Sequence, residues 1–194
     1  MNFDEIYQEG LKSYGESPQA LHWINYPSQA IRFKYLVKDL EIEGKTILDA
    51  GCGMGDVLPF LYARADKFKY LGVDKNQNFI DIAKKRYSGH SFSVGDPFSG
   101  KFEGKYDVVL SSGVMNHNID GWLKERQRMI TALFGLTKEV LAFNMAGGFK
   151  PIASDSKIAY ANTNDVLDFC LTLTNKVSLR TDYSGYDFTV IMRR

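Results

Sequence analysis

The stretch that decides the fold is Ile47-Leu48-Asp49-Ala50-Gly51-Cys52-Gly53-Met54-Gly55-Asp56. An apolar strand pattern runs into three glycines at alternate positions, and a helical pattern follows. Glycine permits positive φ and lets the backbone approach a ligand closely at the N-terminus of a helix. We therefore expect a strand–loop–helix unit that binds a ligand at the loop. Because any tight strand–helix turn favours glycine, the loop alone leaves the ligand open.

The residues around the loop favour one class of ligand over another. A dinucleotide-binding fingerprint needs a glycine three positions after the second loop glycine, and this chain has Asp56 there. Asp49 stands just before the loop. Two carboxylates would repel a pyrophosphate, so the sequence predicts a ligand without phosphate and with positive charge. A nicotinamide-dependent oxidoreductase is disfavoured on this ground.

Strand and helix patterns alternate after Gly44 and predict an α/β fold, a mostly parallel sheet with helices on both faces. The expected strands are 46–50, 70–74, 91–95, 106–112, 139–144, 177–183 and 187–193. The expected helices are 56–65, 77–87, 120–134 and 164–173, after two helical patterns near the start. The last two strands follow each other directly, which predicts an antiparallel pair at the sheet edge. We expect one domain over 1–194, with an N-terminal helical cap over 1–43 and an α/β core over 44–194.

Composition and charge exclude several classes of function. The chain has 24 Lys+Arg against 23 Asp+Glu. This balance lacks the excess of positive charge that is typical of binding to a nucleic acid or an anionic membrane. The basic runs 84–86 and 124–128 are expected to be solvent-exposed helix faces. Cys52 and Cys170 lie far apart with no CxxC spacing, and with three histidines they form no zinc pattern. The acidic start of the chain resembles no signal peptide and no apolar run spans a bilayer, so a soluble, cytoplasmic protein is expected.

Polar residues stand at the carboxyl ends of the expected strands, where an open α/β sheet binds its ligand. Asp74 ends the second strand, 23 residues after Gly51. An acidic residue there typically accepts hydrogen bonds from ribose hydroxyls, although Asp74 could instead share the N-cap of the next helix with Asn76. Asp96 follows the third strand, and the fourth strand ends in two serines. Together these positions predict a nucleoside-binding crevice.

With these residues in view, the run from Ile47 to His117 resembles the class I S-adenosylmethionine-dependent methyltransferases. The resemblance is carried by ILDAGCGMGD, YLGVDKN, SVGDPF and YDVVLSSGVMNH and by the paired terminal strands, and it extends over about 28–194. It implies a doubly wound, mostly parallel seven-stranded sheet whose last strand inserts antiparallel. It also implies S-adenosylmethionine as cofactor and S-adenosylhomocysteine as product.

The resemblance also implies the roles of individual residues toward the cofactor. Asp49, Gly51 and Gly53 would line the methionine part, with Cys52 between the two glycines, and Asp74 would bind the ribose. Lys75, Asp96 and the backbone at Pro97 would bind the adenine. Ser111 or Ser112 would contact the ligand at the end of the fourth strand. Related enzymes place a basic side chain from the helix before the first strand on the cofactor carboxylate. Arg32 is the candidate here, and an ordinary surface arginine is the alternative.

Methyl transfer from a sulfonium rests mainly on aligning the nucleophile, the methyl group and the sulfur. A general base is needed only when the acceptor loses a proton. His117 and Asn116 follow the fourth strand and are the catalytic candidates, with a structural role for His117 as the alternative. Serines stand where metal-dependent O-methyltransferases place an aspartate, so no metal site is expected.

The acceptor site is expected from 7–23, 115–118 and 145–160, and the last segment contains Gly147, Gly148 and Pro151 and could act as a lid. These segments are polar and aromatic without a basic patch, which favours a small molecule over a polymer. The sequence therefore predicts a metal-independent methyltransferase for a small-molecule acceptor. A non-catalytic module that binds S-adenosylmethionine or S-adenosylhomocysteine is the alternative, and the oligomeric state stays open.

Overall fold

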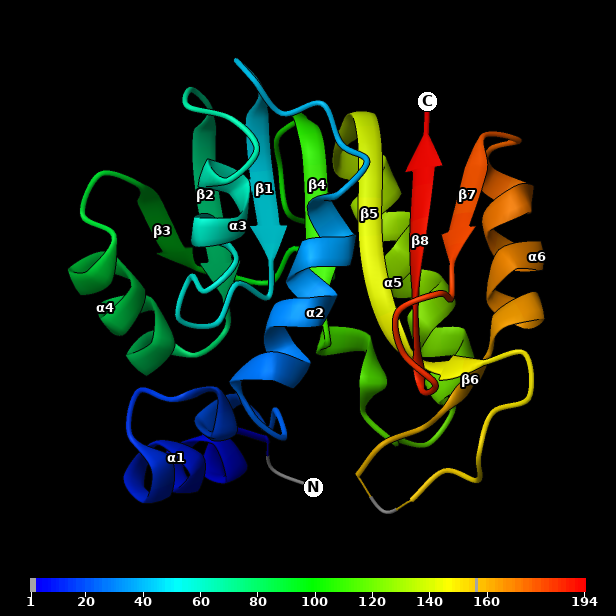
Figure 1. Cartoon of the computed structure of the whole chain (residues 1–194), viewed down its shortest axis with the longest axis horizontal. Helices are drawn as coiled ribbons and strands as arrows, with labels where there is room; N and C mark the ends of the chain where they lie inside the picture. Colours follow the sequence, from blue (N-terminus) through cyan, green and yellow to red (C-terminus); the bar gives the residue numbers. More distant parts are fainter. Residues whose placement is uncertain (1–2, 156) are drawn as a thin grey trace.

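The structure is a computed structural model that describes residues 3–155 and 157–194. Its strands are β1 (Thr46–Ala50), β2 (Lys69–Asp74), β3 (Ser91–Val94), β4 (Tyr106–Ser112), β5 (Thr137–Gly148), β6 (Ala161–Asn162), β7 (Val177–Arg180) and β8 (Asp187–Arg193). They form one sheet in the order β3-β2-β1-β4-β5-β8-β7, and the short β6 pairs with β5 beside this path (Figure 1). The first five strands pair in parallel, whereas β8 runs antiparallel between β5 and β7. The expected doubly wound sheet with an antiparallel last strand is confirmed.

The helical elements are α1 (Phe3–Tyr14), η1 (Pro18–Leu21), α2 (Tyr26–Val37), α3 (Leu58–Tyr62), α4 (Gln77–Arg86), η2 (Val114–Asn116), α5 (Trp122–Leu136) and α6 (Thr163–Leu173). α2 begins at a capping box, in which Asn25 Oδ1 accepts from Ser28 N at 2.9 Å and Ser28 Oγ accepts from Asn25 N at 3.2 Å. α3 is shorter than the expected helix 56–65, because the loop after β1 continues to Val57.

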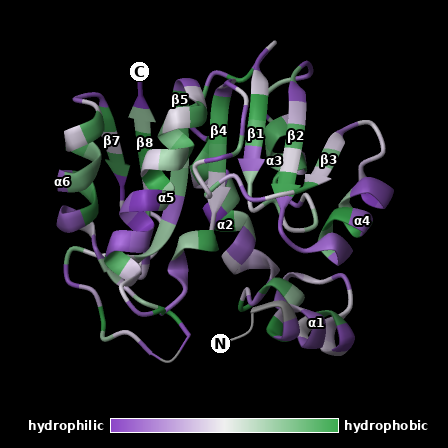
Figure 2. Cartoon of the chain, turned by 180° about the vertical axis from the view of Figure 1, so that it is seen from behind, coloured by the Kyte–Doolittle hydropathy of each residue, from purple (hydrophilic) through white to green (hydrophobic). Residues whose placement is uncertain are grey.

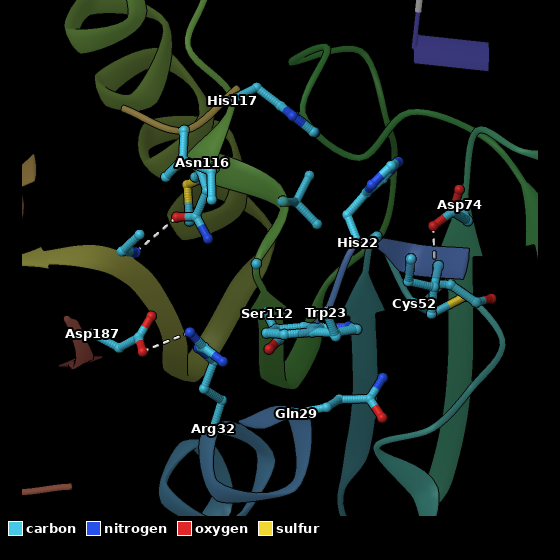
Figure 3. Close-up of a pocket in the computed structure, with 18 of the residues that line it drawn as sticks. His22, Trp23, Gln29, Arg32, Cys52, Asp74, Ser112, Asn116, His117 and Asp187 are labelled. Carbon is cyan, nitrogen blue, oxygen red and sulfur yellow. Dashed lines mark hydrogen bonds and ion pairs between the residues drawn. The ribbon is translucent and has the colours of Figure 1, made fainter. Parts of the chain in front are cut away.

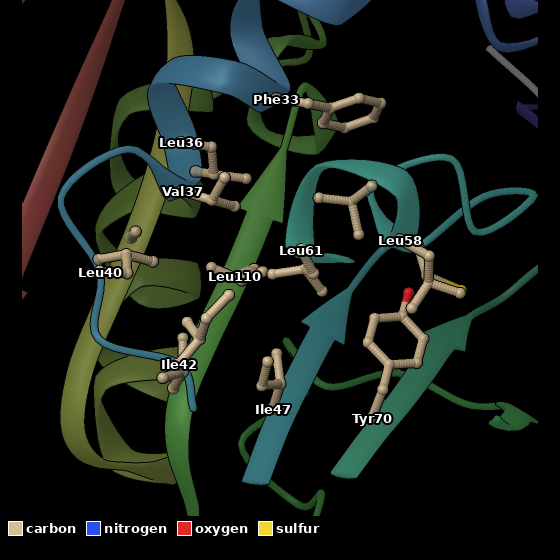
Figure 4. Packing of buried hydrophobic residues seen from close by; sticks show 14 of the residues in the cluster. Phe33, Leu36, Val37, Leu40, Ile42, Ile47, Leu58, Leu61, Tyr70 and Leu110 are labelled. Carbon is tan, nitrogen blue, oxygen red and sulfur yellow. The ribbon is translucent and has the colours of Figure 1, made fainter. Parts of the chain in front are cut away.

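Two hydrophobic layers enclose the sheet, one on each face. Ile47 and Leu48 are neighbours in β1 and both fully buried, but they belong to opposite layers, as the alternation of strand side chains requires. Figure 4 shows one layer, in which side chains of α2 and α3 meet those of β1, β2 and β4. Each fully buried aliphatic side chain contributes roughly 1.5–3 kcal/mol. In Figure 2, hydrophobic residues gather on the central strands, and hydrophilic residues are frequent on α4.

The fold brings several distant segments to the carboxyl ends of the parallel strands. α1 lies below the ends of β1 and β2 (Figure 1), and the segments 149–155 and 157–160 lie at the same end of the sheet. α2 belongs to the expected cap 1–43, yet it packs on the sheet and contributes Phe33, Leu36 and Val37 to its core. In the part of the chain that the structure describes, no helix combines the length and apolar character needed to cross a bilayer.

Candidate functional site

A cavity of about 920 Å³ lies at the carboxyl ends of the strands. Its walls come from α1, η1, α2, the loop after β1, the end of β2, η2, α5, the segment 149–160 and the turn before β8. In Figure 3, Asp74 and Cys52 lie on one side of it, and Asn116, Arg32 and Asp187 lie on the other. Small-ligand sites usually measure about 300–1,000 Å³. The cavity is at the upper end of that range, which suits a cofactor together with a second small molecule.

The glycine loop is built by close contacts that only glycine allows. Gly51 has φ 76°, and a Cβ added to it would lie 2.2 Å from Val114 Cγ2. The amides of Gly51 and Cys52 donate to Val73 O at 2.8 and 3.1 Å. The loop is therefore held against β2 with its backbone open to the cavity, as a ligand-binding loop requires.

Asp74 ends β2 and lines the cavity. Its Oδ2 accepts from Gly53 N and its Oδ1 from Asn76 N, both at 2.9 Å. Burial raises its pKa and these hydrogen bonds oppose that rise. Asn76 is the N-cap of α4, since its Oδ1 accepts from Asn78 N and Phe79 N. The N-cap alternative for Asp74 is thus not supported, and its carboxylate oxygens retain lone pairs for further donors.

Two carboxylates near the loop carry less negative charge than the sequence argument assumed. Asp56 pairs with Arg86 at 3.0 Å and accepts from Gln29 Nε2 at 3.2 Å. Asp49 is buried, accepts from the Tyr70 hydroxyl at 2.7 Å, and burial raises its pKa to about 7. Repulsion of a pyrophosphate by these two residues is therefore weaker than expected, because Arg86 offsets the charge of Asp56 and the raised pKa of Asp49 reduces its ionised fraction at neutral pH.

Other residues expected at the cofactor divide between the cavity wall and positions behind it. Cys52, Lys75, Pro97 and Ser112 line the cavity. Lys75 pairs with Asp96 at 2.9 Å, and burial raises the pKa of the Cys52 thiol well above its usual range. Asp96 and Ser111 are not among the lining residues. Ser111 is fully buried because successive strand side chains point to opposite faces, so of the two serines only Ser112 faces the cavity.

Arg32 lies on the cavity wall, where a partner for the cofactor carboxylate was expected. Its guanidinium is already engaged: one nitrogen pairs with Asp187 at 2.6 Å and another donates to Ser28 O at 2.7 Å. The group lies 4.9 Å from the centre of the Trp23 ring. The surface-arginine alternative is wrong, and the role of Arg32 toward the cofactor stays a prediction.

The two catalytic candidates both reach the cavity. Asn116 ties η2 to β5, since its Oδ1 accepts from Ala146 N at 2.8 Å. His117 Nε2 and the Tyr7 hydroxyl form a hydrogen bond of 3.3 Å. Burial, with His22 and Arg126 nearby, lowers the pKa of His117 to about 4. His117 is therefore neutral near pH 7, as a proton acceptor must be.

Sequence reasoning missed Arg126 and Asp187, which both line the cavity. The run 124–128 was expected on a solvated helix face, but Arg126 is only 3% exposed. Helical spacing contained the signal, because Trp122, Arg126 and Ile130 are four residues apart and so share one face of α5. Asp187 gave no such signal, since its partner Arg32 is distant in sequence.

The expected lid is shorter than the segment 145–160. β5 continues to Gly148, where it pairs with β6, and Met145 and Ala146 are buried against β8. The expectation of a loop from Met145 is therefore wrong, because pairing with two other strands outweighs the local glycines. The part that remains is tied back by Ala159 N, which donates to Asn116 O at 2.9 Å.

A family model described as a methyltransferase domain matches residues 47–139 of this chain. A Mycobacterium tuberculosis protein named as a methyltransferase is 24% identical over 155 residues, 77% of this chain and 93% of that protein. The ubiquinone biosynthesis O-methyltransferase of Coxiella burnetii is 26% identical over 141 residues, 70% of this chain and 55% of that protein. The protein-lysine N-methyltransferase EFM4 of Saccharomyces cerevisiae is 26% identical over 128 residues, which are 59% of this chain and 56% of that protein. The chain spans about half the length of the latter two.

A solved structure shows the same fold over nearly the whole chain. Magnesium protoporphyrin IX methyltransferase from Synechocystis PCC 6803 with bound S-adenosylhomocysteine is similar with a TM-score of 0.70 and 18% identity, over 99% of this chain and 96% of that one. The family match contains the glycine loop and the carboxylate that closes against it. The match to a methyltransferase domain, the relatives named as methyltransferases and this shared fold support a class I S-adenosylmethionine-dependent methyltransferase, a family that uses S-adenosylmethionine and releases S-adenosylhomocysteine.

Proposed function

We propose that this protein transfers a methyl group to a small-molecule acceptor without a metal ion. One observation carries the proposal: a single cavity joins the glycine loop and Asp74 to Tyr7, His117 and Arg126. Cofactor and acceptor can therefore meet in one cavity, which is what alignment for in-line displacement requires.

The residues at one end of the cavity fit the cofactor. The positive φ of Gly51 and the 2.2 Å approach of a Cβ there to Val114 mean that a side chain would fill the cradle. We expect Gly51 and Gly53 to hold the methionine part and Asp74 to accept from the ribose hydroxyls. When bound, S-adenosylmethionine supplies a methyl group activated on a sulfonium.

The residues at the other end can hold an acceptor and take a proton from it. His117 lines this end of the cavity and its lowered pKa keeps it neutral, which makes it the candidate for taking a proton where the acceptor atom must lose one. Burial, with Asp74 nearby, raises the pKa of Tyr7 to about 12, so its hydroxyl keeps its proton beside His117. Side chains of α1 and of the segments 149–155 and 157–160 border this end.

The size of the cavity, about 920 Å³, favours a small acceptor over a polymer. The Coxiella relative is named for ubiquinone biosynthesis, which supports a small molecule, whereas the yeast relative is named for protein lysine. A lysine side chain from another protein would have to enter past α1 and the segment 149–160, which both line the cavity. A small molecule meets no such barrier.

Calorimetry and a transfer assay test this function. S-adenosylmethionine and S-adenosylhomocysteine should bind, and NAD and NADP should not. Methyl-labelled cofactor incubated with a metabolite extract should then label material of low molecular weight, and label in protein would contradict the small acceptor. Binding without any transfer would support the non-catalytic alternative.

Metal independence has its own test. Among residues 3–155 and 157–194, no group of three or more His, Cys, Asp or Glu could hold a metal ion. A chelator should therefore leave the transfer rate nearly unchanged. A rate that chelation abolishes and Mg²⁺ restores would overturn this part of the proposal.

A further inference from the structure

Arg126 is a buried cation whose hydrogen bonds are incomplete. It is 3% exposed and lines the cavity. Its Nη2 donates to Ala159 O, and its guanidinium lies 4.4 Å from the centre of the Trp122 ring. Nε and Nη1 have no hydrogen-bond partner anywhere in the described chain. Burying such groups is unfavourable unless something pairs with them.

The carboxylates of the cavity wall are committed elsewhere. Five acidic residues line the cavity, and each has other partners: Asp49 with Tyr70, Asp56 with Arg86, Asp74 with backbone amides, Glu125 with Arg128, and Asp187 with Arg32. Among the described residues, no carboxylate pairs with Arg126. This part of the wall therefore carries an uncompensated positive charge.

Neighbouring groups add to that charge. Lys157 lines the cavity beside His22 and acts on the pKa of that histidine, while Arg126 acts on the pKa of His117. Burial lowers the pKa of Arg126 only to about 10, so the guanidinium stays charged at neutral pH. A ligand group bound here gains from being an anion.

Apolar side chains make up much of the rest of this end of the cavity. Its lining includes Met115, Ile119, Trp122, Met129, Ile152 and Ile158. A phosphate carries two charges and needs several donors, whereas one guanidinium satisfies one carboxylate. A buried guanidinium in largely apolar surroundings matches a molecule with a carboxylate and an apolar body.

We propose that Arg126 binds a carboxylate of the methyl acceptor, and that the acceptor is an apolar organic acid. This inference rests on the proposed function, because it names the class of molecule that would accept the methyl group at the same site. Arg126 is a specificity-determining residue in this account. The cofactor remains at the other end of the cavity, with Gly53 and Asp74.

Matched pairs of fragments test the proposal directly. Benzoate, 4-phenylbutyrate and octanoate are each compared with their primary amides, and phenyl phosphate is the phosphate arm. Dissociation constants are measured by calorimetry with wild type, Arg126→Met, Arg126→Lys and a matched control, Arg64→Met, with and without S-adenosylhomocysteine. Arg64 is exposed and does not line the cavity.

We expect wild type and Arg64→Met to bind at least one carboxylate about 10- to 100-fold more tightly than its amide. Arg126→Met should remove that difference while leaving the affinity for S-adenosylhomocysteine within about twofold. Its melting temperature should hold or rise, because an unpaired buried charge is replaced by an apolar side chain of similar shape. Arg126→Lys should bind carboxylates more weakly than wild type, since it lacks the planar fork.

Three results would overturn the proposal: no carboxylate preference in wild type, a preference that both Arg126 variants retain, or tighter binding of phenyl phosphate than of benzoate. Loss of S-adenosylhomocysteine binding in Arg126→Met would assign the residue to the cofactor instead. If wild type binds carboxylates but not S-adenosylhomocysteine, the proposed function fails and the anion site stands, so the two failures are distinguishable.

Discussion

The two ends of the cavity satisfy their polar groups in different ways. At the cofactor end, Asp74 accepts from two backbone amides and Asp49 from a tyrosine hydroxyl. At the acceptor end, Arg126 keeps two nitrogens without a partner in the described chain. The cofactor end is thus assembled before ligand arrives, whereas the acceptor end is left incomplete.

This difference separates binding strength from specificity. A preorganised cofactor end lets binding energy go to the ligand rather than to ordering the loop. Unpartnered donors at the acceptor end penalise any ligand that lacks the matching acceptor atom, which is how buried polar groups discriminate between substrates. Variants at the two ends should therefore fail in different measurements.

Gly51→Ala should produce the largest effect. The change places a Cβ 2.2 Å from Val114 Cγ2 at a positive φ, so we expect a loss of about 2–4 kcal/mol in the free energy of unfolding and at least a 100-fold loss of affinity for S-adenosylhomocysteine. Gly44→Ala is the control, because Gly44 has φ 73° and nothing within 4 Å of its added Cβ. Chemical denaturation should show only about 1–2 kcal/mol there. Equal losses in the two variants would mean that the contact with Val114 is unimportant.

Asp74→Ala should weaken binding of S-adenosylhomocysteine by about 10- to 100-fold, because charged hydrogen bonds to the ribose are lost. It should also lower the free energy of unfolding by about 1–3 kcal/mol, since Gly53 N and Asn76 N lose their acceptor. Asp74→Asn keeps an amide oxygen and should lose less on both counts. Calorimetry and denaturation on the same two variants separate these effects.

His117 predicts a specific pH dependence of stability. Its pKa is about 4 in the folded chain against about 6.5 in the unfolded chain, so the unfolded state binds more protons between these values. Stability from the neutral imidazole is full above pH 6.5 and is lost as pH falls toward 4. Relative to His117→Gln, wild type should lose on the order of 2 kcal/mol over that window. A difference between the two proteins that does not change with pH would show that His117 titrates normally.

Replacing Ser111 or Ser112 by alanine should give the smallest effects on the free energy of unfolding, and the two changes should have opposite signs. The Ser111 hydroxyl is buried without a hydrogen-bond partner in the described residues, so Ser111→Ala should be neutral or stabilise by up to about 1 kcal/mol. Ser112 donates to Asn144 Oδ1 at 3.1 Å, and Ser112→Ala should destabilise by about 0.5–1.5 kcal/mol. Only Ser112→Ala should change the affinity for S-adenosylhomocysteine. An altered affinity in Ser111→Ala would show that this serine also reaches the cofactor.

The cofactor end could be predicted from the sequence because its parts are local. The loop at Gly51 and the strand end at Asp74 are short motifs, and the expected strand 46–50 matches β1. The acceptor end depends on contacts between distant segments, such as Tyr7 with His117 and Arg126 with Ala159, which leave no local pattern.

Arg126 shows how one kind of pattern can hide another. Its neighbours Lys124 and Arg128 make the run look like a solvated face, whereas helical spacing places Arg126 with Trp122 on the buried face. The prediction from charge was wrong, and the helical spacing of Trp122 and Arg126 would have corrected it, because tertiary packing selects the buried face of a helix.

One crossed titration tests the division of the cavity most directly. S-adenosylhomocysteine and 4-phenylbutyrate are each titrated by calorimetry into wild type, Asp74→Ala and Arg126→Met. The account predicts that Asp74→Ala loses at least tenfold in affinity for S-adenosylhomocysteine and keeps its affinity for 4-phenylbutyrate, while Arg126→Met does the reverse. Equal losses of both ligands in either variant would contradict two separate ends of one cavity.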